Sequence, residues 1–207
     1  MKTAFLLFFF FVISLFVRSS HGAAFLPLKF TAKFTQEYKS VVTGKVKKGH
    51  GYFDYQFPGM LRFEMYKPSP LIFITKANQN WYYRPPFVDG ELGEVRKNVS
   101  GGQAISKFFD ALSEGLENNK YYKISKKEKN NIKITFNKAS SEELGIKEAV
   151  LVFNSKVHAF TKLKSINLDY LDGKKNKIIF DKISLVDNFS RLNFIFKENN
   201  PPKIRTN

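Results

Sequence analysis

The side chains that could do covalent or acid–base chemistry are few in this chain, and their spacing does not bring them together. After residue 22 only two histidines remain, His50 and His158, and neither belongs to a cluster with metal-ligand spacing. Cysteine is absent, and no GxSxG sequence supplies a nucleophilic serine. The carboxylate pairs Glu142-Glu143 and Glu114 with Glu117 are predicted to lie on a solvated loop and a solvated helix face. We therefore predict a protein that is not an enzyme and that uses no cofactor and no metal ion.

What the chain offers instead is apolar surface on short strands. Residues 51–87 alternate large apolar and polar side chains, and Pro58-Gly59 and a Pro-Ser-Pro sequence at 68–70 interrupt them. This pattern is typical of antiparallel strands joined by proline turns. A sheet with so bulky an inner face either packs a core or encloses an apolar ligand, and the pattern alone leaves both open.

The strands and one helix that must position this surface are predicted from periodicity. Joints such as Asp172-Gly173 favour turns between strands. The expected strands are residues 30–35, 52–57, 60–66, 71–75, 80–83, 121–125, 132–136, 149–153, 163–170, 177–183 and 191–196. About 11 antiparallel strands predict a mainly β (α+β) fold, a large curved sheet or barrel, with no internal repeat.

The helix is predicted over residues 103–117. Its apolar stripe repeats at spacings of three and four and comprises Ile105, Phe108, Phe109, Leu112 and Leu116. We expect a capping box of Ser100 with Gln103, a flexible joint at Gly101-Gly102, and a stop at Asn118-Asn119. A helix between strands must place such a stripe on the apolar face of the sheet, as a fixed plug or as a lid. Spacing alone favours the plug.

The first residues predict an export signal. Lys2 is followed by an apolar run over residues 4–17, which Arg18 ends before the roughly 20 residues that a membrane span needs. Small residues allow cleavage after Gly22 or Ala24. We expect residues 1–22 to be a cleaved signal peptide rather than an uncleaved anchor, and residues 23–207 to form one domain. An exported chain without cysteine favours a bacterial periplasm.

The charge indicates an anionic partner. The full chain carries +16, and loss of Lys2 and Arg18 with the signal lowers this by two, to +14. Lysines are scattered along the sequence, so most of them are expected to be solvated charges on the outer face of the sheet. Lipid head groups, an acidic protein surface or nucleic acid would each fit. Export argues against nucleic acid, which leaves an anionic glycolipid such as lipopolysaccharide as the second candidate class.

A resemblance to a known family follows from the order of several short motifs. They are Phe34-Thr35-Gln36, then Gly51, then residues 58–64 (PGMLRFE), then residues 76–85 (KANQNWYYRP), and, in the C-terminal half, residues 180–183 (FDKI), Asp187-Asn188 and residues 192–196 (LNFIF) near Pro201. In this order the sequence resembles the periplasmic lipoprotein carriers of the LolA family over nearly the whole mature chain.

The resemblance implies an open antiparallel half-barrel covered by short helices over an apolar cavity. It also implies a soluble periplasmic carrier that takes acylated lipoproteins from an inner-membrane lipoprotein-releasing ABC transporter to a receptor, or to the inner leaflet, at the outer membrane. The cargo would be held through its acyl chains without a covalent step. A monomer that binds no nucleic acid is expected, and an acyl-lipid or anionic-glycolipid sensor of the same fold remains the alternative.

The acyl site is predicted on the inner face of the first half of the sheet and on the helix stripe. Side-chain alternation puts Leu61, Phe63 and Met65 on one face. The full predicted set is Leu61, Phe63, Met65, Phe73, Trp81, Tyr83, Ile105, Phe108 and Leu112, with the helix acting as a lid hinged at Gly101-Gly102. Two departures concern the lid. The family's arginine before Pro-Gly is Phe57 here, and Pro27 leaves little room for an N-terminal helix.

Overall fold

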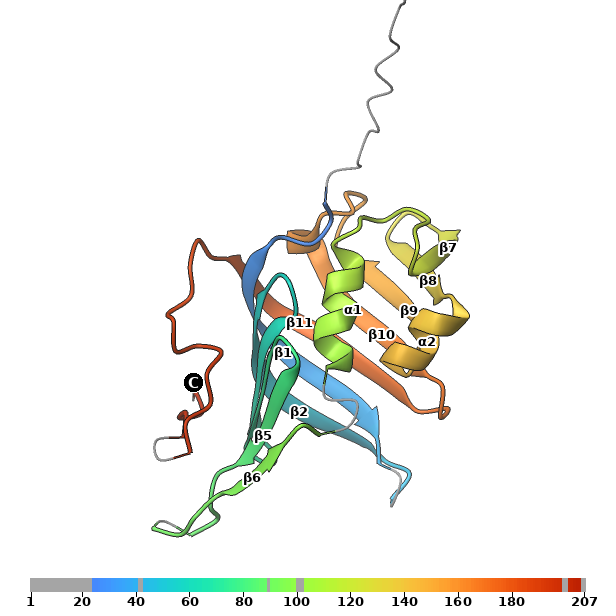
Figure 1. The fold of residues 1–207 in the computed structure, drawn as a ribbon. Helices are drawn as coiled ribbons and strands as arrows, with labels where there is room; N and C mark the ends of the chain where they lie inside the picture. Colours follow the sequence, from blue (N-terminus) through green and yellow to red (C-terminus); the bar gives the residue numbers. More distant parts are fainter. Residues whose placement is uncertain (1–23, 41–42, 89, 100–102, 199–200, 206–207) are drawn as a thin grey trace, which may run out of the picture.

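One antiparallel sheet of eleven strands organises the protein (Figure 1). The computed structural model describes residues 24–40, 43–88, 90–99, 103–198 and 201–205. The strand order is β6-β5-β4-β3-β2-β1-β11-β10-β9-β8-β7, so β6 and β7 are the two edges and the sheet is not closed. This confirms the predicted mainly β fold with an open sheet of about 11 strands. The predicted signal peptide, Ser100 and the Gly101-Gly102 joint lie outside the described residues.

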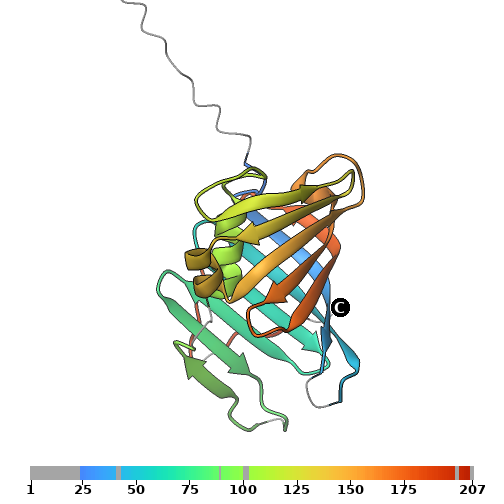
Figure 2. The same cartoon turned by 90° about the vertical axis from the view of Figure 1, so that its right-hand side faces the viewer.

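Strands that are consecutive in the sequence are neighbours in the sheet, from β1 to β6 and from β7 to β11. Their bounds are β1 Lys29–Lys39, β2 Val46–Gln56, β3 Met60–Lys67, β4 Leu71–Lys76, β5 Gln79–Arg84, β6 Glu94–Lys97, β7 Tyr122–Lys127, β8 Asn131–Phe136, β9 Ile146–Phe153, β10 Leu163–Tyr170 and β11 Lys175–Leu185. The helices are α1 Ala104–Leu112 and α2 Lys138–Leu144, with a 3-10 turn at Phe160–Lys162. The two halves of the sheet bend toward each other, and both helices lie on the concave side (Figures 1 and 2).

The main core lies between this concave face and α1. Phe30, Phe34, Phe53 and Tyr55 of β1 and β2 are all completely buried, and Phe109 of α1 packs against three of them, Phe30, Phe53 and Tyr55. Rings in edge and tilted contact add to the burial of their apolar area. The concave face near the bend is therefore filled with aromatic side chains.

A second, smaller core lies on the opposite, convex face of the sheet. Ile72 and Ile74 of β4 and Tyr83 of β5 are buried there against Phe194 and Phe196. These two phenylalanines come from the segment after β11, which was wrongly predicted as a strand. The backbone of this segment forms turns, in which Asn193 N donates to Ser190 O at 3.0 Å. Its apolar residues alternate because they pack on the sheet, and not because the segment is a strand of the sheet.

Both helices differ from the sequence prediction. α1 ends at Leu112 instead of near residue 117, because the Ser113 hydroxyl bonds the carbonyl of Asp110 and Gly115 turns with a φ of 96°. Gln103 is its N-cap and forms no side-chain cap, so the expected capping box is wrong. α2 was missed altogether.

The signals for α2 were present in the sequence. Its N-cap Asn137 accepts a hydrogen bond from Ser140 N, and Gly145 follows the helix with a φ of 67°. An asparagine N-cap and a left-handed glycine after the last turn are common helix boundaries. Glu142-Glu143, predicted in a loop, therefore lie on this helix. Among the described residues, no helix is long and apolar enough to span a bilayer.

Candidate functional site

The concave face carries the first part of the predicted acyl site. Leu61 is buried, Met65 is 9 % exposed, and Phe63 is half-buried and packs against the main core. Phe63 pairs across the ladder with Phe73 of β4, so these two residues share a face. The predicted face is thus correct for Leu61, Phe63, Met65 and Phe73, and the rings of Phe63 and Phe73 are only partly covered by protein.

The predicted face is wrong for Trp81 and Tyr83. In the β4–β5 ladder Ile74 pairs with Trp81 and Ile72 with Tyr83, and both tyrosine and tryptophan pack in the convex core. The residue of β5 that lies beside Phe73 on the concave face is Tyr82. Tyr82 is half-buried, and the guanidinium of Arg84 lies 5.4 Å from the centre of its ring. Phe63, Phe73 and Tyr82 therefore form an aromatic row across three strands.

Helix α1 covers one end of this row. Phe108, Phe109 and Leu112 are buried against the sheet, whereas Ile105, in the first turn, is half-buried. The predicted stripe therefore faces the sheet as expected from its spacing. The C-terminal half of α1 packs closely on the concave face, whereas Ile105 near its N-terminus and the rings of Phe73 and Tyr82 remain partly exposed.

Few polar contacts tie α1 to the rim of the sheet. Asp110 accepts a hydrogen bond from the Tyr55 hydroxyl at 2.5 Å and another from Gly59 N at 2.9 Å. Gln103 Nε2 donates to the Ala77 carbonyl at 2.9 Å. Burial, strengthened by Asp110, raises the pKa of Tyr55 well above its usual range, so its hydroxyl stays a neutral donor. Asp110 thus ties the helix to the Pro58-Gly59 turn.

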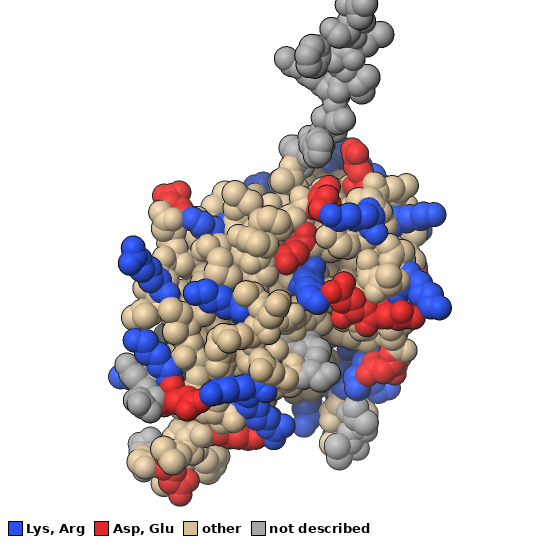
Figure 3. Space-filling model, in the orientation of Figure 1, with Lys and Arg blue, Asp and Glu red and all other residues tan. Residues whose placement is uncertain are grey.

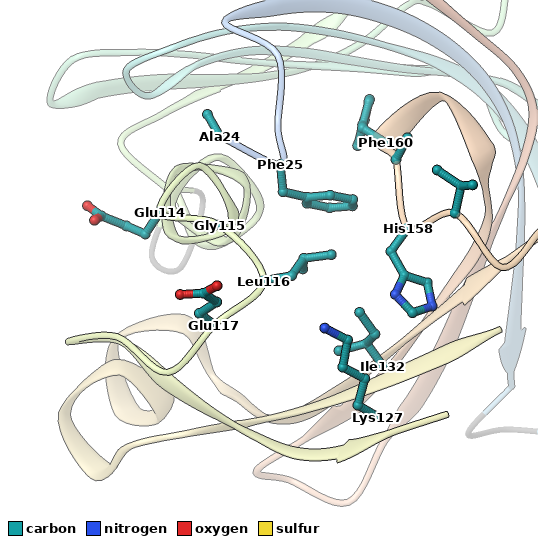
Figure 4. A pocket seen from close by; sticks show the side chains of 12 residues that line it. Ala24, Phe25, Glu114, Gly115, Leu116, Glu117, Lys127, Ile132, His158 and Phe160 are labelled. Carbon is teal, nitrogen blue, oxygen red and sulfur yellow. The ribbon is translucent and has the colours of Figure 1, made fainter. Parts of the chain in front are cut away.

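A pocket of about 460 Å³ opens at the other end of α1 (Figure 4). Phe25, Leu116, Ile132 and Phe160 point toward its interior, with His158 and Lys127 on one wall. Nearby, burial raises the pKa of Tyr122 to about 12, and its hydroxyl donates to the Gly115 carbonyl. None of the predicted acyl-site residues lines this pocket. It is bounded by the segment that precedes β1, by the end of α1 and by the β9–β10 connection.

The residues with catalytic potential do not converge. His50 contacts Thr35 Oγ1 at 3.1 Å, and His158 contacts the Lys129 carbonyl at 3.2 Å. Glu143 pairs with Lys107 of α1 at 2.6 Å. In the part of the chain that the structure describes, no group of three or more histidine, aspartate or glutamate side chains could hold a metal ion. The site is therefore an apolar surface rather than a set of reactive groups.

The family model described as "outer membrane lipoprotein carrier protein LolA" matches residues 28–197, which is most of the chain. No curated protein matches the sequence. Similar solved structures include a LolA superfamily protein from Nitrosomonas europaea, with 9% identity and a TM-score of 0.47 over 82% of this chain and 91% of that one.

Two further structures are similar to a smaller extent. A putative outer membrane lipoprotein-sorting protein domain from Vibrio parahaemolyticus has 12% identity and a TM-score of 0.42, covering 80% of this chain and 88% of that one. A DUF1329 family protein from Desulfovibrio piger has 9% identity and a TM-score of 0.37, covering 81% and 90% of the two chains.

Proposed function

Because the chain belongs to the outer membrane lipoprotein carrier protein LolA family, we propose that it is a monomeric periplasmic carrier that binds lipoproteins through their acyl chains. It takes its cargo from an inner-membrane lipoprotein-releasing ABC transporter and delivers it to a receptor or to the inner leaflet at the outer membrane. The binding is non-covalent, needs no cofactor and involves no catalytic step.

The observation that carries this proposal is the aromatic row of Phe63, Phe73 and Tyr82. The row lies on the concave face, is partly exposed, and continues into the core beneath α1. An acyl chain gains about 0.8 kcal/mol per buried methylene, so a long chain costs on the order of 10 kcal/mol to expose to water. A carrier must offset most of this cost with apolar surface of its own, and the row with the α1 stripe provides such surface.

We propose that the acyl site comprises the concave-face residues and the helix stripe, without the two residues that face the convex core. The proposed set is Leu61, Phe63, Met65, Phe73, Tyr82, Ile105, Phe108 and Leu112. Leu61 of the sheet and Phe108 and Leu112 of α1 are buried between the helix and the sheet in the present conformation, so a long acyl chain reaches them only when α1 moves outward.

Binding of a fluorescent fatty acid tests the site. Phe73→Glu places a carboxylate on the concave face and is expected to weaken binding at least about tenfold, because an acyl chain cannot compensate a desolvated charge. The matched control is Trp81→Glu, which puts the same charge on the convex face in the next strand. Circular dichroism verifies that both variants are folded. Equal loss of binding in the two variants, or none in Phe73→Glu, would contradict the proposed site.

A lid role for α1 predicts a specific pattern of hydrogen exchange. The helix is held by Asp110, Gln103 and its apolar stripe, whereas the central strands are held by continuous ladders. We expect α1 amides to exchange faster than those of β1 and β2 in the free protein, and to slow when fatty acid is bound. Equal protection of α1 with and without lipid would identify it as a fixed plug, the role that its spacing alone favours.

A further inference from the structure

The β5–β6 loop exposes apolar side chains that the acyl site does not use. Phe87 is 103% and Leu92 98% exposed, and Val88, between them, is 54% exposed. Exposed aliphatic residues are common singly on protein surfaces, but a group of them at one loop marks an interaction site. Pro85 and Pro86 begin the loop, and they restrict the backbone from which Phe87 projects.

The loop is anchored firmly at its base. Gly93 lies against the ring of Tyr83 and the carbonyl of Arg84, where an added Cβ would come within 2.6 Å of both. At the base of the loop β5 and β6 are paired from Arg84–Glu94 to Trp81–Lys97. The apolar tip is thus presented by a fixed strand pair, and a tip whose position is fixed loses less conformational entropy on binding.

A second hairpin lies at the same end of the molecule. The described ends of β1 and β2 and those of the β5–β6 hairpin both lie at the end away from α1, on opposite sides of it in Figure 1. The β1–β2 hairpin carries the exposed lysines Lys39, Lys45 and Lys47, together with Val46, which is 67% exposed. In the described residues, none of these three lysines has an acidic partner in an ion pair.

The two hairpins differ in chemistry. Glu91 makes the β5–β6 loop acidic, so this loop can contribute apolar area but no attraction to an anionic surface. In Figure 3 the projection at the lower left is mostly tan, with acidic side chains on it. The lysines of the β1–β2 hairpin supply the attraction to an anionic surface, over a distance of about 8 Å at physiological ionic strength. Apolar side chains and basic side chains presented at one end of a molecule are the combination by which proteins lie shallowly in a membrane interface.

We propose that these two hairpins form a membrane-docking edge that binds the surface of an anionic phospholipid bilayer. Phe87, Val88 and Leu92 insert at the level of the head groups, and Lys39, Lys45 and Lys47 contact the lipid phosphates. The aromatic row of the acyl site lies between this edge and α1, so docking brings the open part of the concave face toward the membrane. The biological role of this docking edge rests on the proposed carrier function. Its existence is tested separately, because vesicle binding and fatty-acid binding are two different measurements.

Vesicle sedimentation tests the docking edge. The chain starting at Ala23 is used, because the apolar run at 4–17 would itself bind lipid. Vesicles of phosphatidylethanolamine with phosphatidylglycerol are compared with vesicles of phosphatidylcholine alone. We expect the anionic vesicles to bind the protein more tightly at low salt, and each of Phe87→Ser and Leu92→Ser to weaken binding on the order of tenfold. Lys45→Gln with Lys47→Gln should reduce binding only at low salt, since high salt already screens their charge.

The matched control is the double variant Leu185→Ser with Leu192→Ser. Both leucines are exposed, at 60% and 56%, and both lie outside the two hairpins. Vesicle binding should be unchanged in this control, and fatty-acid binding should be unchanged in all of these variants. Absence of binding to anionic vesicles, or equal loss in the control, overturns the docking edge while leaving the carrier proposal intact. Vesicle binding without fatty-acid binding overturns the carrier proposal alone.

Discussion

Replacing Gly51 with alanine is expected to destabilise the protein by at least about 3 kcal/mol, the upper range for overpacking a core. Gly51 lies in the middle of β2, where an added Cβ would stand 2.0 Å from the Glu64 carbonyl and 2.7 Å from the ring of Phe34. The carbonyl belongs to the ladder between β2 and β3 and cannot move away without breaking it. Urea unfolding measured by circular dichroism provides the free energy of unfolding.

Gly173→Ala is the matched control. Gly173 has a φ of 79°, which alanine adopts only with strain, but a Cβ there would meet no atom within 4 Å. Its substitution should cost about 1 kcal/mol, the usual loss at a left-handed position. If Gly51→Ala costs no more than Gly173→Ala, the close approach of Phe34 to β2 is not a constraint on the fold. The comparison separates a clash in the core from backbone strain in a turn.

The same contact explains one of the sequence motifs. Phe34 stacks on Phe53 at 4.2 Å and on Phe63 at 5.2 Å between ring centres, so its ring lies over Gly51 and reaches the start of the aromatic row. A phenylalanine in β1 and a glycine directly opposite it in β2 are therefore one packing unit. The motif positions the ring that packs against Phe63 beside the proposed acyl site.

The strands were predictable wherever one face is buried. Burial alternates along the first half of β1 and along β8, and the start of β1 and both ends of β8 were predicted to within one residue. β6 gave no such signal, because all four of its residues are exposed at the sheet edge. The segment 191–196 gave a false signal, because Phe194 and Phe196 alternate into the convex core from a backbone without strand partners.

The faces of Trp81 and Tyr83 could not be predicted from alternation within one strand. The β4–β5 turn consists of two residues, Ala77 and Asn78, so Lys76 pairs with Gln79 and Phe73 with Tyr82. A two-residue turn always places odd positions of one strand beside even positions of the next. Trp81 and Tyr83 would share the face of Phe73 only across a turn with an odd number of residues. Register across a turn, rather than hydrophobicity, decided which aromatic residue joins the row.

Replacing Glu64 with glutamine is expected to cost about 3–5 kcal/mol, the loss typical of breaking a buried ion pair. Glu64 is completely buried on the convex face and accepts hydrogen bonds from Arg62 Nε at 2.5 Å and Arg205 Nε at 2.7 Å. Arg205 also contacts Asp54 at 3.0 Å. Glutamine keeps the size of the side chain but removes the charge, which leaves Arg62 buried without a carboxylate partner.

The sequence offers a closely matched control in Glu94→Gln. Glu94 and Arg96 are also two residues apart on one strand and bonded at 2.6 Å, but their side chains are 42% and 64% exposed. An exposed pair contributes about 1 kcal/mol or less, so this variant should unfold at nearly the parent urea concentration. If the two variants lose similar amounts of unfolding free energy, burial of the Arg62–Glu64 pair does not increase its contribution to stability.

A second measurement connects this cluster with the function. Arg205 holds the C-terminal segment over Ile72, Ile74 and Tyr83, so weakening it uncovers apolar surface on the wrong side of the sheet. Trp81, the single tryptophan, packs beside that surface. Its fluorescence in Glu64→Gln should shift to longer wavelength below the unfolding transition, and remain unchanged in Glu94→Gln. An unshifted spectrum in both would mean that the segment stays in place without Glu64. A shift in Glu64→Gln alone would show that the buried charges hold the C-terminal segment on the convex face.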